Sequence, residues 1–328
     1  MSAPRVAVIG CGRHSTNNTL PSLRFTELDL VGVCDVREEA ARRCAKRFGA
    51  PRVEVDYRRL LDPKEVDGVL VVVHASLHDK IAVEAMRAGL HVYTEKPPAL
   101  SAAETLACAR VARATGRICM TAFKKRYAPT YQAARKIIQE EMAPGGRHLE
   151  YTYNFSYYHV GATDAASVFL LDAGIHAIDA VRFFMGEVTA LATFQSGSDG
   201  IESYAVALRL EDGSVGTLNL SSRGTAARPH ELLKVTGSRI TVLVENVVDM
   251  QVYRHEGPTE VLRPSYVGSG NWTEVTTGFA GEAQAFEAAM RDGTVPVSNI
   301  ESSYRSMALF EAIRASRGQV VKVQYEQA

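Results

Sequence analysis

The chain has 328 residues, 46% of them apolar, which is enough for large buried cores and indicates two domains. Its 37 basic residues balance 37 acidic ones with no block of one sign, so the composition argues against nucleic acid or an anionic membrane as partners. The most hydrophobic run, residues 69–73, has the length of a strand and not of a membrane helix, so we expect a cytoplasmic protein with a small-molecule substrate.

Up to about residue 122, short β-branched runs alternate with helical patterns. The pattern predicts strands near 5–10, 30–34, 67–73, 91–94 and 117–121, and helices near 37–48, 78–89 and 101–115. Such alternation predicts a parallel sheet with helices on both faces, here a doubly wound Rossmann domain over residues 1–122. Ser101 and Glu104 form a capping-box pattern before the third helix, and Gly89 and Gly116 lie where helices end.

A glycine loop follows the first strand. Gly10 and Gly12 take the first two positions of the dinucleotide fingerprint, while Ser15 takes the third, where glycine or alanine is usual. Glycine lets the backbone approach a pyrophosphate, so the loop indicates a cofactor site, although glycines after a strand also form ordinary turns. Residues 15–19 are serine, threonine and asparagine, which bond their own backbone, so we expect an irregular loop here.

An acid closes the second strand. Asp35 lies about 20 residues after the glycine motif, the usual interval for a carboxylate that accepts hydrogen bonds from the adenosine ribose. A fixed carboxylate there repels the 2′-phosphate of NADP, so Asp35 favours NAD. Arg37 lies two residues further on and could reach a phosphate, which leaves NADP open as a second cofactor.

The strand near 91–94 ends in a charged pair, Glu95 and Lys96, followed by Pro97 and Pro98. Ligands of open parallel sheets bind beyond the carboxyl ends of the strands, which is where this pair falls. Proline after Lys96 excludes helical backbone and permits a cis bond, so the direction of the lysine side chain can be fixed. A surface ion pair before a loop is the alternative interpretation.

From about residue 123 the pattern changes. It predicts helices near 129–141, 165–185, 279–291 and 300–316, and strands near 148–157, 204–210, 215–219 and 319–325. The two-residue alternation of the middle strands predicts an α/β domain over 123–328 with a mainly antiparallel open sheet. The open face of such a sheet is often covered by another subunit, so we expect a homodimer or homotetramer.

One predicted helix of the second domain carries a polar stripe. Asp172, His176 and Asp179 share a side of the helix next to its apolar face, half-buried. A carboxylate one turn before a histidine can fix its tautomer and support its protonation, as a general base requires. A structural ion pair on the helix is the alternative. No further ligands stand at coordinating spacing, so we expect no metal.

The cysteines indicate neither disulfides nor metal binding. None of the five belongs to a Cys-x-x-Cys pair, and most lie in apolar patterns, where cysteine behaves as a small hydrophobic residue. They are Cys11, Cys34, Cys44, Cys108 and Cys119.

Taken in order along nearly the whole chain, the motifs resemble the glucose-fructose oxidoreductase / inositol dehydrogenase / rhizopine-catabolism (Gfo/Idh/MocA) oxidoreductases. The resemblance rests on Gly10-x-Gly12, Asp35, Glu95-Lys96-Pro97, Asp172-x-Gly174-x-His176-x-x-Asp179, His78, Arg126-Tyr127-Ala128-Pro129 and Gly281-Glu282-x-x-x-Phe286. It implies NAD(P)-dependent oxidation or reduction of a sugar or polyol hydroxyl. Two departures are Ser15, in a loop that is about one residue longer than usual, and Lys124, where relatives often have asparagine.

The resemblance also implies site residues. By position, Lys96, Asp172 and His176 match the catalytic trio, and either Lys96 or His176 is the base. The expected cofactor-binding residues are Gly10, Gly12, Arg13, His14, Ser15, Asp35, Arg37, His74, His78, Glu95, Lys96 and Lys124. The expected substrate-binding residues are Lys96, Arg126, Tyr158, Asp172 and His176.

Two other functions stay open. Transient oxidation of a sugar carbon could acidify the neighbouring proton and permit elimination, giving a glycosidase- or dehydratase-like enzyme without net NAD turnover. A non-catalytic NAD(P)-binding regulator is the other, and the intact trio of Lys96, Asp172 and His176 argues against it, since a regulator needs no proton path.

Overall fold

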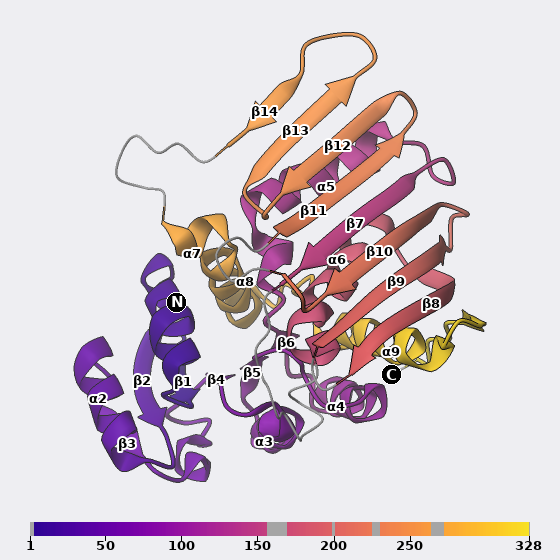
Figure 1. Cartoon of the computed structure of the whole chain (residues 1–328). Coiled ribbons are helices and arrows are strands. Elements are labelled where there is room, and N and C mark those ends of the chain that lie inside the picture. The colour runs from indigo at the N-terminus through magenta and orange to yellow at the C-terminus, as the bar shows by residue number, and fades with distance from the viewer. Residues whose placement is uncertain (1–2, 156–168, 199–200, 225–229, 264–271, 328) are drawn as a thin grey trace. The chain divides into compact units, whose positions relative to one another are not determined.

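The computed structural model describes residues 3–155, 169–198, 201–224, 230–263 and 272–327 (Figure 1). The chain forms two compact units, one of residues 1–124 with 279–304 and one of residues 125–278 with 305–327. The first division lies close to the boundary expected after residue 122. The segment 279–304 differs, because the expected second domain included it whereas the structure assigns it to the first unit.

The first unit is built on a six-stranded sheet in which every neighbouring pair is parallel. Its order is β3-β2-β1-β4-β5-β6, so the order of the strands reverses between β1 and β4, the place where doubly wound sheets bind ligands. The strands are β1 (Arg5–Ile9), β2 (Asp29–Cys34), β3 (Arg52–Glu54), β4 (Gly68–Val71), β5 (His91–Thr94) and β6 (Cys119–Thr121).

Four longer helices belong to this unit: α2 (Glu38–Phe48), α3 (His78–Arg87), α4 (Ala102–Thr115) and α8 (Phe279–Asp292). The capping box is confirmed, because the Ser101 side chain accepts from the Glu104 N–H at the start of α4, and Gly116 ends that helix in the left-handed region. α8 packs closely on the sheet, since a Cβ on Gly68 would lie 2.7 Å from the sulfur of Met290.

The irregular loop expected after Gly12 is wrong. Helical residues start at Arg13 and continue through a π-helical turn, η1 (Ser15–Thr19), into α1 (Leu20–Ser22) and η2 (Leu23–Phe25). A π-helical turn holds more residues per turn than an α-helix, so it accommodates the one-residue excess without breaking the helix. The Thr16 hydroxyl donates to the Gly12 carbonyl at 3.0 Å, so this polar side chain bonds within the helix.

The second unit is built on a nine-stranded sheet of order β14-β13-β12-β11-β7-β10-β9-β8-β15. β7 and β10 are parallel, and all other pairs are antiparallel. The strands are β7 (His148–Asn154), β8 (Val188–Ser198), β9 (Ile201–Leu210), β10 (Val215–Ser221), β11 (His230–Gly237), β12 (Ile240–Glu245), β13 (Asp249–Arg254), β14 (Glu260–Leu262) and β15 (Val320–Lys322).

Helices cover one face of this sheet. α5 (Pro129–Glu141) packs on β12 and β13, and α6 (Ile175–Met185) packs on β7 and β10 (Figure 1). Buried and exposed residues alternate along β10, as the two-residue period predicts. The fold class is therefore confirmed, a parallel Rossmann sheet followed by a mainly antiparallel α/β part. The other helices are α7 (Thr273–Thr276) and α9 (Ile300–Ser316).

Candidate functional site

The two glycines of the loop after β1 have different surroundings. Gly10 has a φ of +101°, and a Cβ there would lie 2.0 Å from the carbonyl oxygen of Val72, so only glycine fits. A Cβ on Gly12 would meet no atom within 4 Å, so the backbone of Gly12 faces open space. One glycine is thus required by the fold, and the other leaves the loop approachable by a ligand.

The Asp35 carboxylate lies beside this loop, where the sequence predicts contact with ribose. It accepts from the Cys11 N–H at 3.0 Å and from the Arg37 N–H at 2.9 Å. Burial raises the pKa of Asp35, but the hydrogen bonds from Arg37 and Cys11 outweigh burial and hold the pKa below its ordinary value. Asp35 is therefore an anion with a fixed position.

A cavity of about 700 Å³ opens between the glycine loop and α2, and its lining includes Cys11 and Arg37, the two residues that donate to Asp35. We name it the basic pocket, because five of its lining residues carry a positive charge. They are Arg13, Arg37, Arg43, Lys46 and Arg47. The sequence motifs include Arg13 and Arg37 but not Arg43, Lys46 and Arg47, which the 3.6-residue period of α2 brings to this side of the helix.

Glu95 follows β5 and is buried, with 6% of its surface exposed. One carboxylate oxygen lies 2.9 Å from Nε2 of His14, and the other accepts from the Lys96 N–H at 3.1 Å. Burial raises the pKa of Glu95, and His14 and Lys96 more than compensate, so the pKa is lowered. The peptide bond between Lys96 and Pro97 is cis.

Phe279, at the start of α8, joins this group although no sequence motif pointed to it. The Lys124 Nζ lies 4.0 Å from the centre of its ring, and the His14 ring lies 5.9 Å from it. The structure thus brings the predicted residues His14, Glu95 and Lys124 together within the first unit. Phe279 thus makes a cation–π contact with Lys124 and a ring contact with His14.

The two other predicted histidines differ in setting. His78 is 1% exposed, and its ring nitrogens lie 2.7 Å from the Pro97 carbonyl oxygen and 3.0 Å from that of Val73. It therefore ties together the loops after β4 and β5. His74 is exposed, with Nδ1 2.9 Å from the Ser76 hydroxyl. Ser15 is buried in η1, with 0% of its surface exposed.

In the second unit, Asp172 lies in a π-helical turn, η7 (Leu170–Gly174), and His176 in the first turn of α6. Both are half-buried between fully buried neighbours, as expected. The uniform helix expected for their shared stripe is wrong, because the π-helical turn changes the spacing between Asp172 and His176. Such turns are frequent at functional sites.

The charge of Asp172 also acts on Tyr153 of β7. Burial, Glu231 and Asp172 together raise the pKa of Tyr153.

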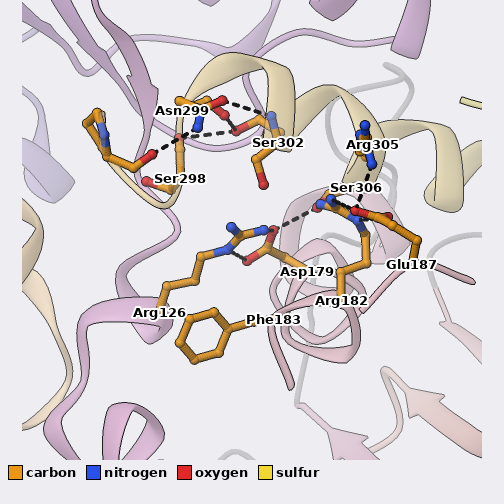
Figure 2. Close-up of polar contacts among 12 residues, drawn as sticks. Arg126, Asp179, Arg182, Phe183, Glu187, Ser298, Asn299, Ser302, Arg305 and Ser306 are labelled. Atoms are coloured by element: carbon orange, nitrogen blue, oxygen red, sulfur yellow. Dashed lines mark hydrogen bonds and ion pairs between the residues drawn. The ribbon is translucent and has the colours of Figure 1, made fainter. Parts of the chain in front are cut away.

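Asp179 and Arg126, by contrast, form a closed pair. The Arg126 guanidinium donates two hydrogen bonds to Asp179, at 2.6 and 2.7 Å, and Asp179 also accepts from the Ser306 hydroxyl at 2.7 Å. Figure 2 shows the chain of contacts continuing from Ser306 to Arg182, which donates to Glu187. The guanidinium of Arg126 is buried and bound by a protein carboxylate, which indicates a structural role in place of the expected substrate contact.

A second buried ion pair escaped sequence reasoning. The Lys125 Nζ lies 2.6 Å from a carboxylate oxygen of Glu231, and the hydroxyls of Tyr131 and Tyr151 donate to the other oxygen. Lys125 also lies 4.3 Å from the Tyr153 ring. More than 100 residues separate Lys125 from Glu231, so no local pattern could have paired them. Tyr158 lies outside the described residues.

Two searches covered the part of the chain that the structure describes. Among these residues, no group of three histidine, cysteine, aspartate or glutamate side chains is placed to hold a metal ion. None of the described helices is long and apolar enough to cross a membrane.

Comparison with known proteins gives consistent matches. The model of the oxidoreductase family with an NAD-binding Rossmann fold (GFO_IDH_MocA) matches residues 4–123, and that of the GFO/IDH/MocA C-terminal domain matches residues 131–243. D-apiose dehydrogenase of Paraburkholderia graminis is 24% identical over 97% of this chain and 89% of its own length. Myo-inositol 2-dehydrogenase of Thermotoga maritima is 24% identical over 76% of this chain and 77% of its own. The solved structure of levoglucosan dehydrogenase with NADH superimposes with a TM-score of 0.87 at 20% identity, covering 99% of this chain and all of that one.

Proposed function

Because the chain belongs to the GFO/IDH/MocA oxidoreductase family, whose amino-terminal domain is an NAD-binding Rossmann fold, we propose that it is an NAD(P)-dependent dehydrogenase or reductase of a sugar or polyol hydroxyl. The observation that supports this most directly is the fixed Asp35 carboxylate beside the approachable backbone of Gly12. Relatives named for apiose and inositol support the substrate class.

In this proposal the protein prefers NAD as its cofactor and binds NADP more weakly. Gly12 would face the pyrophosphate, and Asp35 would accept from the ribose hydroxyls. The N–H groups that hold Asp35 leave its remaining lone pairs for those hydroxyls. The basic pocket next to it moderates the repulsion of a 2′-phosphate, which is why NADP is not excluded.

When bound, nicotinamide supplies the hydride acceptor or donor, and the side chains handle the proton. We propose that His176 removes the hydroxyl proton of the substrate while Lys96 hydrogen-bonds to the same oxygen and stabilises its developing negative charge. Asp172 orients the imidazole of His176 or the adjacent hydroxyl. The opposite assignment, with Lys96 as the base, predicts a different pH profile for the two single variants.

Absorbance at 340 nm tests the proposal. NAD and NADP are each offered with a panel of inositols, aldoses, uronates and keto-sugars, and we expect turnover with at least one member, faster with NAD. No turnover together with no calorimetric affinity for either nucleotide would overturn the function. Incorporation of solvent deuterium into product without net NADH would instead favour the oxidation–elimination reaction.

The second unit also supports the proposal of a homo-oligomer. Helices cover one face of the nine-stranded sheet, and exposed residues alternate with buried ones along β9 and β10. Phe194 on β8 is 71% exposed, and Val215 on β10 is 48% exposed. Light scattering after size exclusion should give a dimer or tetramer mass at micromolar concentration, and a monomer mass contradicts it.

A further inference from the structure

Two cysteines that the proposed reaction does not use line the basic pocket. Cys11 stands between Gly10 and Gly12 in the glycine loop, and Cys44 stands on α2. Both thiols are reduced, and both residues are buried, at 7% and 2% exposure. They therefore meet a small molecule only through this pocket, which has a volume of about 700 Å³.

The surroundings of Cys44 suit a reactive thiol. It lies in a wall that also carries Arg13, Arg43 and Arg47, and positive side chains favour the thiolate, the form of cysteine that attacks oxidants. The side-chain interaction between the two thiols lowers the pKa of Cys44 and raises that of Cys11, and the Cys11 thiol also donates to the Cys34 carbonyl at 3.6 Å. Cys44 is thus the thiol more easily deprotonated for attack on an oxidant, and Cys11 lies beside it in the same pocket.

We propose that Cys11 and Cys44 form a modification site at which hydrogen peroxide, entering through the basic pocket, joins the two sulfurs in a disulfide. The Cys44 thiolate attacks a peroxide oxygen, the O–O bond breaks, and the departing hydroxide takes up the proton released by Cys44, giving water and a sulfenic acid. The Cys11 sulfur then attacks the Cys44 sulfur, the S–O bond breaks, and a second water leaves with the Cys11 proton. The two thiols lose two electrons, and the peroxide gains them.

The disulfide would act on the cofactor site, a consequence that rests on the proposed function. It ties the glycine loop to α2 through a residue whose N–H holds Asp35 in place. The loop then loses the freedom to adjust to a pyrophosphate next to Gly12. Oxidation should weaken NAD binding about 10-fold or more, and bound NAD should slow the oxidation by filling the approach.

The molecule contains a matched control pair. Cys108 on α4 and Cys119 on β6 also hydrogen-bond through their thiols, and both are at least as buried, at 1% and 2% exposure. Both belong to the core of the parallel sheet, and neither lines the basic pocket. Peroxide that enters the folded protein through the basic pocket should not oxidise Cys108 and Cys119. Peroxide that reacts only with unfolded protein should oxidise both pairs.

The primary test uses the full chain, reduced, desalted and treated with hydrogen peroxide with or without NAD. Remaining thiols are alkylated and the peptides mapped by mass spectrometry. We expect a Cys11–Cys44 link, lighter by two hydrogens, to form at least about 10-fold faster than a Cys108–Cys119 link, and more slowly with NAD present. Equal rates for the two pairs, or no Cys11–Cys44 link in folded protein, overturn the proposal.

Calorimetry of NAD binding then tests the effect of the disulfide separately from its formation. After peroxide, the chain and its Cys108→Ser variant should lose NAD affinity, while Cys44→Ser should keep whatever affinity it had before treatment. Loss of affinity in Cys44→Ser equal to that of the parent overturns the coupling. If the untreated chain has no NAD affinity, the proposed function fails, and the peptide map still decides the modification site.

Discussion

Two aspartates, one in each unit, are each held by an arginine, and they differ in what surrounds the pair. Asp35, whose side chain is 9% exposed, is bonded to Cys11 and Arg37, which both line a cavity of about 700 Å³, and the Arg37 side chain is 70% exposed. Asp179 and Arg126 are 3% and 6% exposed, and Ser306 occupies part of the remaining bonding capacity of Asp179. The same chemical pair therefore has an exposed partner beside a cavity in one unit and is enclosed by the fold in the other.

The comparison extends along one helical segment of the second unit. Asp172 and His176 are half-buried, whereas Asp179, one turn after His176, is enclosed. A carboxylate or imidazole can contact a substrate only if part of its side chain is exposed. Substitutions can therefore separate residues that act on a ligand from residues that stabilise the fold.

The largest effect is expected for His176→Ala. Loss of a general base should lower turnover about 10²–10⁴-fold while NAD affinity and thermal stability stay close to those of the parent. Steady-state kinetics and calorimetry on the same preparation check this. Turnover that stays unchanged, or that falls only in proportion to the loss of folded protein, would show that His176 is not the general base.

Arg126→Ala should act in the opposite way. It leaves Asp179 as a buried carboxylate without its cation, which costs about 3–5 kcal/mol in unfolding free energy. The matched change, Arg37→Ala, removes the exposed partner of Asp35 and should cost about 0.5 kcal/mol or less. Denaturant unfolding of both variants compares them directly, and equal losses would contradict the distinction.

Asp35→Ser should change cofactor preference more than stability. Removing the carboxylate takes away hydrogen bonds to the ribose and the repulsion of a 2′-phosphate, while Arg13 and Arg43 still line the basic pocket. The ratio of kcat/KM for NAD to that for NADP should fall about 10- to 100-fold. If the ratio does not move, Asp35 serves the loop alone and not the ribose.

Glu282 tests a buried carboxyl bonded by a tyrosine instead of an arginine. It is 1% exposed and accepts from the Tyr93 hydroxyl at 2.7 Å, and burial, together with the charge of Glu95, raises its pKa well above 4.5. A raised pKa means stability that is full below 4.5 and is lost as the pH rises, by about 1.4 kcal/mol for each pKa unit.

Glu282→Gln keeps a hydrogen-bond acceptor for Tyr93 without the charge. It should match the parent in melting temperature near pH 4.5 and exceed it at pH 8, whereas the same change at the exposed Glu211 should leave the melting temperature unchanged at both pH values. A variant less stable than the parent at pH 8 would show that Glu282 is needed as an anion.

Much of this arrangement follows from local sequence. The period of apolar residues predicts the strands and helices, and the short-range motifs around Gly10, Asp35 and Glu95 predict where a ligand approaches the first sheet, because each depends on neighbours along the chain. The π-helical turns at 15–19 and 170–174 were missed, since one surplus residue changes spacing without changing composition.

The closed networks could not be predicted for a different reason. Arg126 with Asp179, and Lys125 with Glu231, join residues 53 and 106 positions apart, and each side chain alone has the pattern of an ordinary surface charge. Lys125 and Arg126 lie in the turn η5 (Lys124–Tyr127), and only the packing of this turn on α6 and β11 buries these charges together. The sequence therefore predicts a substrate contact for Arg126, where the structure shows a contact within the fold.

The return of α8 to the first sheet makes the Rossmann unit discontinuous along the chain. Met290 and Phe286 fill the space that Gly68 leaves, so residues 1–124 cannot complete their own core until residue 290 has been synthesised. During translation the nascent amino-terminal half must therefore wait, with part of its sheet uncovered, for more than 150 further residues to leave the ribosome. Any exchange of cofactor units between relatives has to transplant both segments together.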